Sequence, residues 1–217
     1  ELFYGQLALE RLGRSVPAPP AASPQAASAA QRAAFNNRRL VQALRILGQQ
    51  RRPTEQALFV QALATDLNAD IDRHLAVELG QQLGRQDLPV WVARMARNNG
   101  SMFYVREAFP THRSHGSGSW SLVHGITRQE SSFDPYAVSH AGALGMMQLM
   151  RPTAREQAGK MGLGYDGDRL LSDPNYNVTL GSAYLQRMIN NWNGSVPLAV
   201  ASYNAGSGNV RKWVRAY

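Results

Sequence analysis

The stretch that decides the fold lies at residues 128–135, which read Arg-Gln-Glu-Ser-Ser-Phe-Asp-Pro. Just before it, Val123 and Ile126 lie three residues apart, and Glu130 follows four residues later. This spacing is the pattern of one buried helix face, so the helix carries a carboxylate on its apolar side. Pro135 disfavours helical backbone at the residue before it. The helix is therefore expected to end just after Glu130.

A carboxylate on the apolar side of a helix end is a candidate general acid. Burial penalises the charged form, so the pKa of Glu130 should rise. An acid that is still protonated near neutral pH can donate a proton to a reacting group. The alternative is a solvated glutamate, or one paired with the nearby Arg128. Periodicity alone leaves both interpretations open.

Composition bounds the class of protein without naming a function. The chain has 217 residues, enough for one large domain or two smaller ones, and 44% of them are hydrophobic. No apolar run reaches the roughly 18 residues that a membrane span needs. No signal peptide opens the chain, which therefore looks like a piece of something longer. The absence of cysteine excludes disulfides and cysteine-based metal sites.

The formal net charge of +8 favours polyanionic surroundings such as nucleic acid, anionic lipid or an acidic cell-wall polymer. The basic residues are spread along the chain, and no zinc-finger or RNA-recognition signature accompanies them. We therefore expect that nucleic acid is not a partner.

Turn and capping signals divide the chain into short helices, so the predicted fold class is all-α. Pairs of short helices in the first half are typical of a superhelical scaffold. A break rich in Gly and Ser follows at residues 112–119, and its His112 and His115 lack the further ligands that a metal site needs. We expect a scaffold with linker helices over residues 1–113 and a second domain over residues 114–217.

Local signals also predict the individual elements. Residues 15–28, rich in Pro, Ala and Ser, are expected to form a connector. The helix that starts at Pro53 is expected to bury Leu58, Ala62 and Leu63. The expected helices lie at about residues 7–12, 40–48, 53–63, 70–83, 89–96, 120–130, 173–192, 195–204 and from 210 onward.

Two further stretches could line a cleft. Residues 142–150 read Gly-Ala-Leu-Gly-Met-Met-Gln-Leu-Met, in which the glycines allow close approach and the methionines could supply soft walls for a sugar face. Tight packing with methionine as a gap-filler is the simpler interpretation. Residues 201–206 read Ala-Ser-Tyr-Asn-Ala-Gly. Such a helix end can place a phenol and an amide at a cleft, although it is often only a cap.

In this order and spacing, Glu-Ser-x-Phe, Gly-x-x-Gly-x-Met-Gln-x-Met and Ala-x-Tyr-Asn-Ala-Gly resemble the soluble lytic transglycosylases. These are lysozyme-like bacterial enzymes that cleave peptidoglycan. The resemblance runs from about residue 121 to residue 214, and the first half resembles, more loosely, the helical scaffold of the large members. It implies a lysozyme-like α-helical catalytic domain. Family members continue with a motif containing Glu-Thr and Tyr-Val, so we expect this domain to be truncated at its C-terminus.

The resemblance implies that Glu130 is the only catalytic carboxylate. It would protonate the glycosidic oxygen of the β-1,4 bond between N-acetylmuramic acid and N-acetylglucosamine. It would then deprotonate the muramic C6 hydroxyl, which closes a 1,6-anhydro ring without water, a substrate-assisted exception to the two-carboxylate scheme. Tyr203 would orient Glu130 by a hydrogen bond. The substrate-binding positions implied are Ser139, Met147, Gln148, Met150, Tyr203 and Asn204, and no metal or organic cofactor is implied.

The resemblance also implies where the protein works. Its partner would be the glycan strand of peptidoglycan, with cell-wall synthesis or division proteins as further partners. The place would be the bacterial periplasm after export, although no signal peptide is visible in this chain.

Two alternatives remain open. A hydrolase of the goose-lysozyme type needs a second carboxylate, and a non-catalytic glycan-binding helical module would need none, although the intact Glu130 argues against the latter. None of the carboxylates available for hydrolysis is expected to be buried. They are Asp134, Glu156, Asp166, Asp168 and Asp173.

Overall fold

The computed structural model describes residues 3–16, 26–101, 103, 105–113, 116 and 118–216. Within these residues all regular elements are helical, which confirms the predicted all-α class. In chain order they are α1 (Phe3–Arg11), α2 (Ala29–Asn36), α3 (Arg39–Gln49), α4 (Pro53–Asp66), α5 (Asp70–Leu83), α6 (Asp87–Asn98), the 3-10 turn η1 (Arg106–Ala108), α7 (Trp120–Glu130), α8 (Arg151–Lys160), α9 (Arg169–Ser172), α10 (Pro174–Asn191), α11 (Val196–Ala205) and α12 (Ser207–Ala216).

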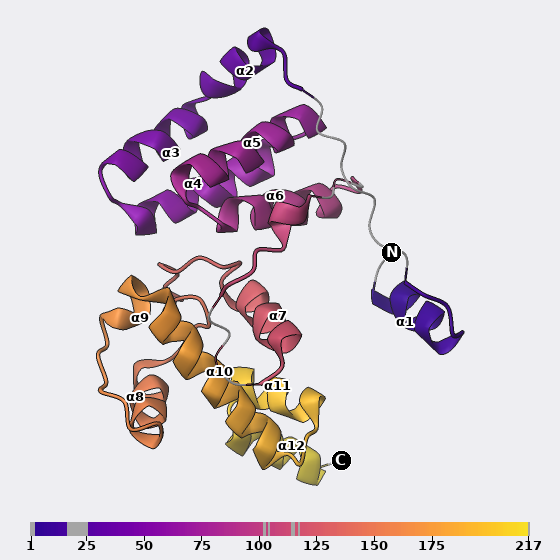
Figure 1. Ribbon diagram of the computed structural model, residues 1–217, viewed down its shortest axis with the longest axis vertical. Helices are drawn as coiled ribbons and strands as arrows, with labels where there is room; N and C mark the ends of the chain where they lie inside the picture. The colour runs from indigo at the N-terminus through magenta and orange to yellow at the C-terminus, as the bar shows by residue number, and fades with distance from the viewer. Residues whose placement is uncertain are drawn as a thin grey trace.

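The helices gather in two groups, α2 to α6 at the top of Figure 1 and α7 to α12 below. In the first group α3 packs on α4, and both α4 and α5 pack on α6. In the second, α10 contacts α8, α9 and α11. The division of the chain at residues 113 and 114 stays a prediction.

Helix α6 contributes to the cores of both groups. Val92 and Ala96 are buried in the core of α2 to α6, whereas Val90 is fully buried in the core of the second group, with Ile126 and Val178. Because α6 buries side chains in both cores, it joins the two groups.

The first half contains two departures from the predicted elements. Helix α2 was not predicted, although Ser28 and Gln31 form a reciprocal capping box at its start. In α4 the predicted apolar face was partly wrong: Leu58 is 69% exposed and Ala62 is exposed too, whereas Leu63 is buried as predicted, together with Val60. Residues 17–25 of the predicted connector lie outside the described residues.

The second half contains the helix ends that the sequence predicted. Helix α7 ends at Glu130, and α10 begins after Asp173, whose carboxylate accepts from the Tyr176 N–H at 3.1 Å. Helix α11 ends before Gly206, whose φ of 81° is a backbone conformation that favours glycine. The short helices α8 and α9 were not predicted.

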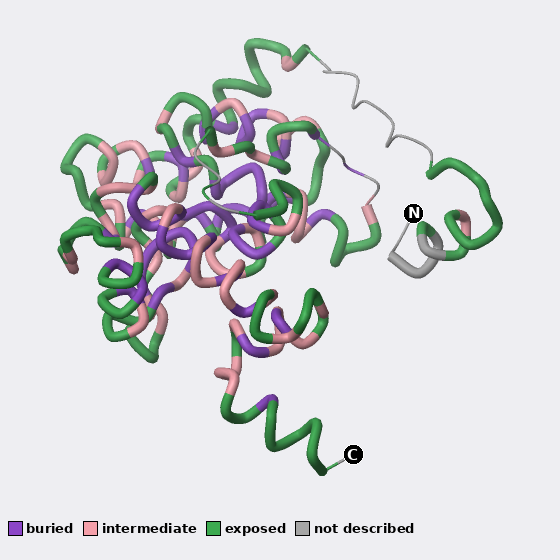
Figure 2. Tube along the Cα trace, turned by 60° about the horizontal axis from the view of Figure 1, so that its bottom comes forward, coloured by how far each residue is buried: buried purple, intermediate pink, exposed green. Residues whose placement is uncertain are grey.

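Burial follows the same arrangement. Buried positions run through the interior of the molecule in Figure 2, while α12 is exposed along most of its length apart from Val210. Among the described helices, none is both long and apolar enough to cross a bilayer.

Candidate active site

Glu130 is the last residue of α7 and is half-buried. Burial raises the pKa of its carboxyl, as the sequence predicted. Arg128 does not pair with it, because the Arg128 Nε donates to the Ala108 carbonyl at 3.3 Å and its guanidinium lies over the ring of Phe109. In the described part of the chain, no side chain forms a salt bridge or a hydrogen bond with the Glu130 carboxyl. A half-buried, unpaired acid is suited to holding and then donating a proton.

The turn after Glu130 has an unusual backbone. Ser132 and Phe133 are both left-handed, with φ of 56° and 70°, a conformation that non-glycine residues adopt at a cost. Ser131 fixes the turn: its hydroxyl donates to the Met146 carbonyl at 2.8 Å and accepts from the Phe133 N–H at 3.1 Å. Ser131 was not predicted as a site residue. The serine beside the glutamate in the first motif was the signal for it.

Residues 137–149 form a compact loop that faces this turn. The Gly145 N–H donates to the Ala137 carbonyl at 2.8 Å. The Gln148 side chain donates to the carbonyls of Ala137 at 3.1 Å and Gly145 at 2.9 Å. The Met147 N–H donates to the buried Asn177 side chain at 2.9 Å. The two bonds of the Gln148 side-chain nitrogen use its N–H donors within the loop, so its side-chain oxygen is the acceptor that remains available to a ligand.

Tyr203 of α11 joins the third motif to the other two. Its hydroxyl donates to the Met147 carbonyl at 2.6 Å, not to Glu130, so the predicted hydrogen bond to the acid is wrong in this structure. Burial raises the pKa of Tyr203 well above its usual value, and the charges of Glu130 and Tyr184 raise it further. The phenol of Tyr203 therefore keeps its proton.

The three motifs thus meet at the peptide groups of two adjacent methionines. Ser131 holds the carbonyl of Met146, and Tyr203 holds the carbonyl of Met147. Hydrogen bonds to the backbone thus connect the residue after Glu130, the loop and the phenol of Tyr203.

The remaining predicted site residues have different positions. The Met147 side chain is fully buried and packs against Gly181, where a Cβ would lie 2.6 Å from its sulfur. It therefore cannot line a groove in this structure, because it fills the core. The Ser139 hydroxyl accepts from the Ala143 N–H at 2.9 Å, whereas Met150 and Asn204 are exposed. The substrate contacts of these three residues remain predictions.

Asp134 corrects the expectation that no second carboxylate is buried. It is 4% exposed, and its two oxygens accept from the Tyr136 N–H at 3.0 Å and from Arg85 at 3.1 Å. Burial raises the pKa of Asp134 to about 6, the charge of Asp87 raises it too, and Arg85 opposes both. Asp134 is held inside the protein, so it is not placed to activate a water molecule in a cleft.

Replacing Asp134 with Asn should change how stability depends on pH. The pKa of Asp134 is about 6 in the folded chain against an ordinary value of 3.8. Between pH 3.8 and about pH 6 the folded chain keeps the proton on Asp134, whereas the unfolded chain releases it. The wild-type protein therefore loses stability as pH rises through this range. Denaturant unfolding should therefore show that the free energy of unfolding of Asp134→Asn, relative to that of the wild type, is about 2 kcal/mol higher at pH 7 than at pH 4. An equal difference at both pH values would contradict this.

Removing the Tyr203 hydroxyl should weaken the fold. Tyr203→Phe leaves the Met147 carbonyl without its partner, so we expect a loss of about 1–2 kcal/mol in the free energy of unfolding. The control is Tyr184→Phe, because in the described residues the Tyr184 hydroxyl has no hydrogen-bond partner, and its loss should cost less than about 0.5 kcal/mol. Equal losses in the two variants would show that the bond to Met147 is not stabilising.

In the described residues, no three His, Cys, Asp or Glu side chains lie close enough together to bind a metal ion. The backbone N–H of His112 donates to Nε2 of His124 at 2.9 Å. His115, the other histidine of the break, lies outside the described residues.

Comparison with known proteins identifies the family. The family model of the transglycosylase SLT domain matches residues 109–217, half of the chain. The chain belongs to the SLT domain family. All the motif residues described above lie inside the matched segment.

Individual SLT relatives agree with this assignment. The soluble lytic murein transglycosylase of Escherichia coli is 37% identical over 95 residues, which are 43% of this chain and 15% of the relative. This chain therefore matches only a small part of that protein's length.

Solved SLT structures extend the likeness to the scaffold. An inactive mutant of the lytic transglycosylase Slt from Pseudomonas aeruginosa gives a TM-score of 0.78 at 27% identity, covering 99% of this chain and 35% of that one. The 70-kDa soluble lytic transglycosylase of Escherichia coli gives a TM-score of 0.77 at 24% identity, covering 98% and 34%. The fold of α2 to α12 is thus the fold of a segment of these larger proteins.

Proposed function

We propose that this chain carries the catalytic site of a peptidoglycan lytic transglycosylase, with Glu130 as its single catalytic carboxylate. The observation that carries the proposal is the meeting of three motifs around this acid, through Ser131 on one side and Tyr203 on the other. Membership of the SLT domain family and the names of its relatives support the reaction class.

Glu130 would act twice in this reaction. Its raised pKa favours the protonated form, which donates to the glycosidic oxygen between N-acetylmuramic acid and N-acetylglucosamine. The resulting carboxylate then accepts the proton of the muramic C6 hydroxyl as that oxygen bonds to C1. The product is a 1,6-anhydro ring, and no water is consumed. Asp134, the only other carboxylate of the turn, is held by Arg85, which supports chemistry with one carboxylate.

Substrate contacts are proposed for the accessible residues of the site. The side-chain oxygen of Gln148 and the exposed side chains of Met150 and Asn204 are candidates to bind the glycan. Ser139 and Tyr203, which are partly buried, are proposed as further contacts. The substrate would be the glycan strand of peptidoglycan, and the place of action the periplasm of a bacterium. Cell-wall synthesis or division proteins would be further partners.

The product spectrum of digested cell walls tests the reaction. Purified protein should release muropeptides that end in 1,6-anhydro-muramic acid, which mass spectrometry resolves from products heavier by one water. Reducing ends would instead identify a hydrolase of the goose-lysozyme type. Binding of glycan without any release would identify a non-catalytic module.

A further inference from the structure

A buried cluster of three charged side chains joins the scaffold to the turn that follows Glu130. Arg85 lies between α5 and α6 and binds both oxygens of Asp87, at 2.8 and 2.6 Å. The same guanidinium donates to Asp134 at 3.1 Å and to the Pro53 carbonyl at 3.0 Å. The three charged residues are each less than 5% exposed. Burial alone would lower the pKa of Arg85, but the two carboxylates raise it, so the arginine stays charged.

The cluster stabilises the end of the turn at residues 131–134, whose backbone conformation is unfavourable by itself. Ser132 and Phe133 keep left-handed backbone that isolated residues of these types avoid. Such a conformation persists only where the surroundings fix both of its ends. Ser131 fixes the start, through Met146, and Asp134 fixes the end, through Arg85. Residue 134 lies four positions after Glu130, so movement of this end would move the acid.

A second contact from the scaffold reaches the same helix end. Arg94 of α6 donates from Nη2 to the Arg128 carbonyl at 2.8 Å, a carbonyl in the last turn of α7 that also accepts from the Ser132 N–H at 3.2 Å. Arg94 and Arg85 thus bind α7 and its following turn from one side. Both residues precede the segment that the SLT family model matches.

We propose that Arg85 and Arg94 are positioning residues for the acid Glu130, so that the scaffold completes the active site. This rests on the proposed function of Glu130 but goes beyond it, because neither arginine belongs to the matched catalytic segment. Lysine cannot replace Arg85, since a single ammonium group cannot keep the planar fork on Asp87 and also reach Asp134.

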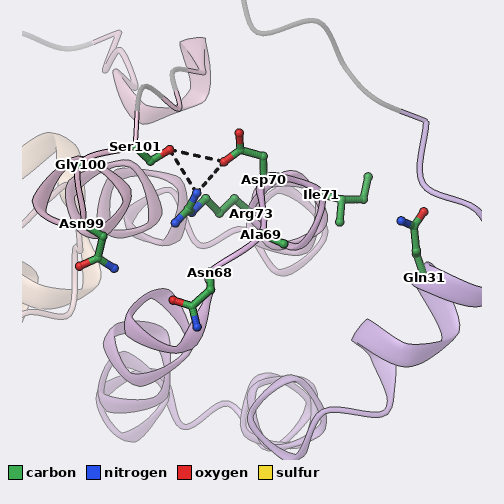
Figure 3. A pocket seen from close by; sticks show the side chains of 9 residues that line it. All are labelled: Gln31, Asn68, Ala69, Asp70, Ile71, Arg73, Asn99, Gly100 and Ser101. Atoms are coloured by element: carbon green, nitrogen blue, oxygen red, sulfur yellow. Dashed lines mark hydrogen bonds and ion pairs between the residues drawn. The ribbon is translucent and has the colours of Figure 1, made fainter.

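Arg73 provides a matched control. Figure 3 shows its guanidinium turned toward Asp70 and Ser101, both in the scaffold. It also donates to the Leu67 carbonyl at 3.2 Å and is 5% exposed. Arg73 is therefore about as buried as Arg85, although it binds one carboxylate where Arg85 binds two and its Nε has no partner in the described residues. Its partners lie far from α7 in the chain. For Arg94 the control is Arg97, an exposed arginine of the same helix.

The experiment compares Arg85→Lys with Arg73→Lys, and Arg94→Gln with Arg97→Gln, in the full chain below their unfolding temperatures. With peptidoglycan as substrate, Arg85→Lys should lower kcat about tenfold and Arg94→Gln about threefold, with KM within about twofold. The controls should stay within about twofold in both constants. A purely structural role would lower the unfolding temperature in Arg85→Lys and Arg73→Lys alike and leave kcat per folded molecule unchanged, which would overturn the inference.

A measurement without turnover separates this inference from the proposed function. NMR titration of carbon-13-labelled glutamate reports the pKa of Glu130 directly. It should fall toward its ordinary value in Arg85→Lys, because a loosened turn exposes the acid to water, and stay unchanged in Arg73→Lys. An unchanged pKa in Arg85→Lys would refute positioning, even if wild-type protein released no anhydro ends. If Arg85→Lys does not fold, the same titration of Arg94→Gln against Arg97→Gln decides.

Discussion

Glu130→Gln is expected to abolish peptidoglycan cleavage while the protein remains folded. The amide has the shape of the acid but can neither donate the proton to the leaving oxygen nor accept one afterwards. Because general acid and base catalysis would both be lost, we expect kcat to fall by about 10³-fold or more. The carboxyl makes no salt bridge or hydrogen bond in the described residues, so unfolding temperature should change little. Release of anhydro-muropeptides, followed by mass spectrometry, measures the effect.

Glu156→Gln is the matched control, since Glu156 is the only other glutamate of the segment that the SLT family model matches. It is exposed, and the hydrogen bond from Arg187 lowers the pKa of its carboxyl, whereas burial raises the pKa of Glu130. Activity should survive this change within about twofold. Unchanged turnover in Glu130→Gln, or equal loss in both variants, would contradict the assignment of the acid.

Gly145→Ala should be the most damaging single change to the loop that faces Glu130. Gly145 has a φ of 72°, and a Cβ there would lie 2.2 Å from the Leu170 carbonyl oxygen and 2.4 Å from the Asn177 side-chain nitrogen. Neither neighbour can retreat, because Asn177 is fully buried and hydrogen-bonded to the Leu144 and Leu170 carbonyls. Backbone strain and the clash together should cost about 3 kcal/mol or more in the free energy of unfolding.

Gly142→Ala separates the clash from the backbone conformation. Gly142 also has a left-handed φ, of 84°, but a Cβ there would meet nothing within 4 Å. Its substitution should cost only about 1–2 kcal/mol, the strain of the left-handed backbone. Denaturant unfolding of both variants measures the difference, and equal losses would show that the contacts to Leu170 and Asn177 do not matter.

Much of the fold follows from local signals in the sequence. The end of α7 at Glu130, the span of α5 and the start of α10 after Asp173 were predicted because caps, prolines and apolar spacing act within a few residues. Helix α2 carried such a signal, the capping box of Ser28 and Gln31, and it was overlooked. Leu58 was misplaced because several apolar stripes fit one short helix, and only tertiary packing selects among them.

The site was less predictable because its decisive contacts join distant parts of the chain. Asp134 is buried by Arg85, 49 residues away, and Tyr203 bonds to a carbonyl 56 residues away. No local pattern encodes such pairs. The motif residues were found, but whether a side chain faces the cleft or the core, as for Met147, depends on the packing of α10 against the loop.

The position of Val90 has a practical consequence for anyone who wishes to transfer this SLT domain into a chimeric protein. The SLT family model begins at Phe109, yet Val90 fills a place among the apolar side chains of α7 and α10. Truncation at the family boundary would remove Val90, leave a cavity in its position and expose the surrounding apolar side chains to water. The smallest transferable piece should therefore begin before Arg85, so that α6 travels with the helices it seals.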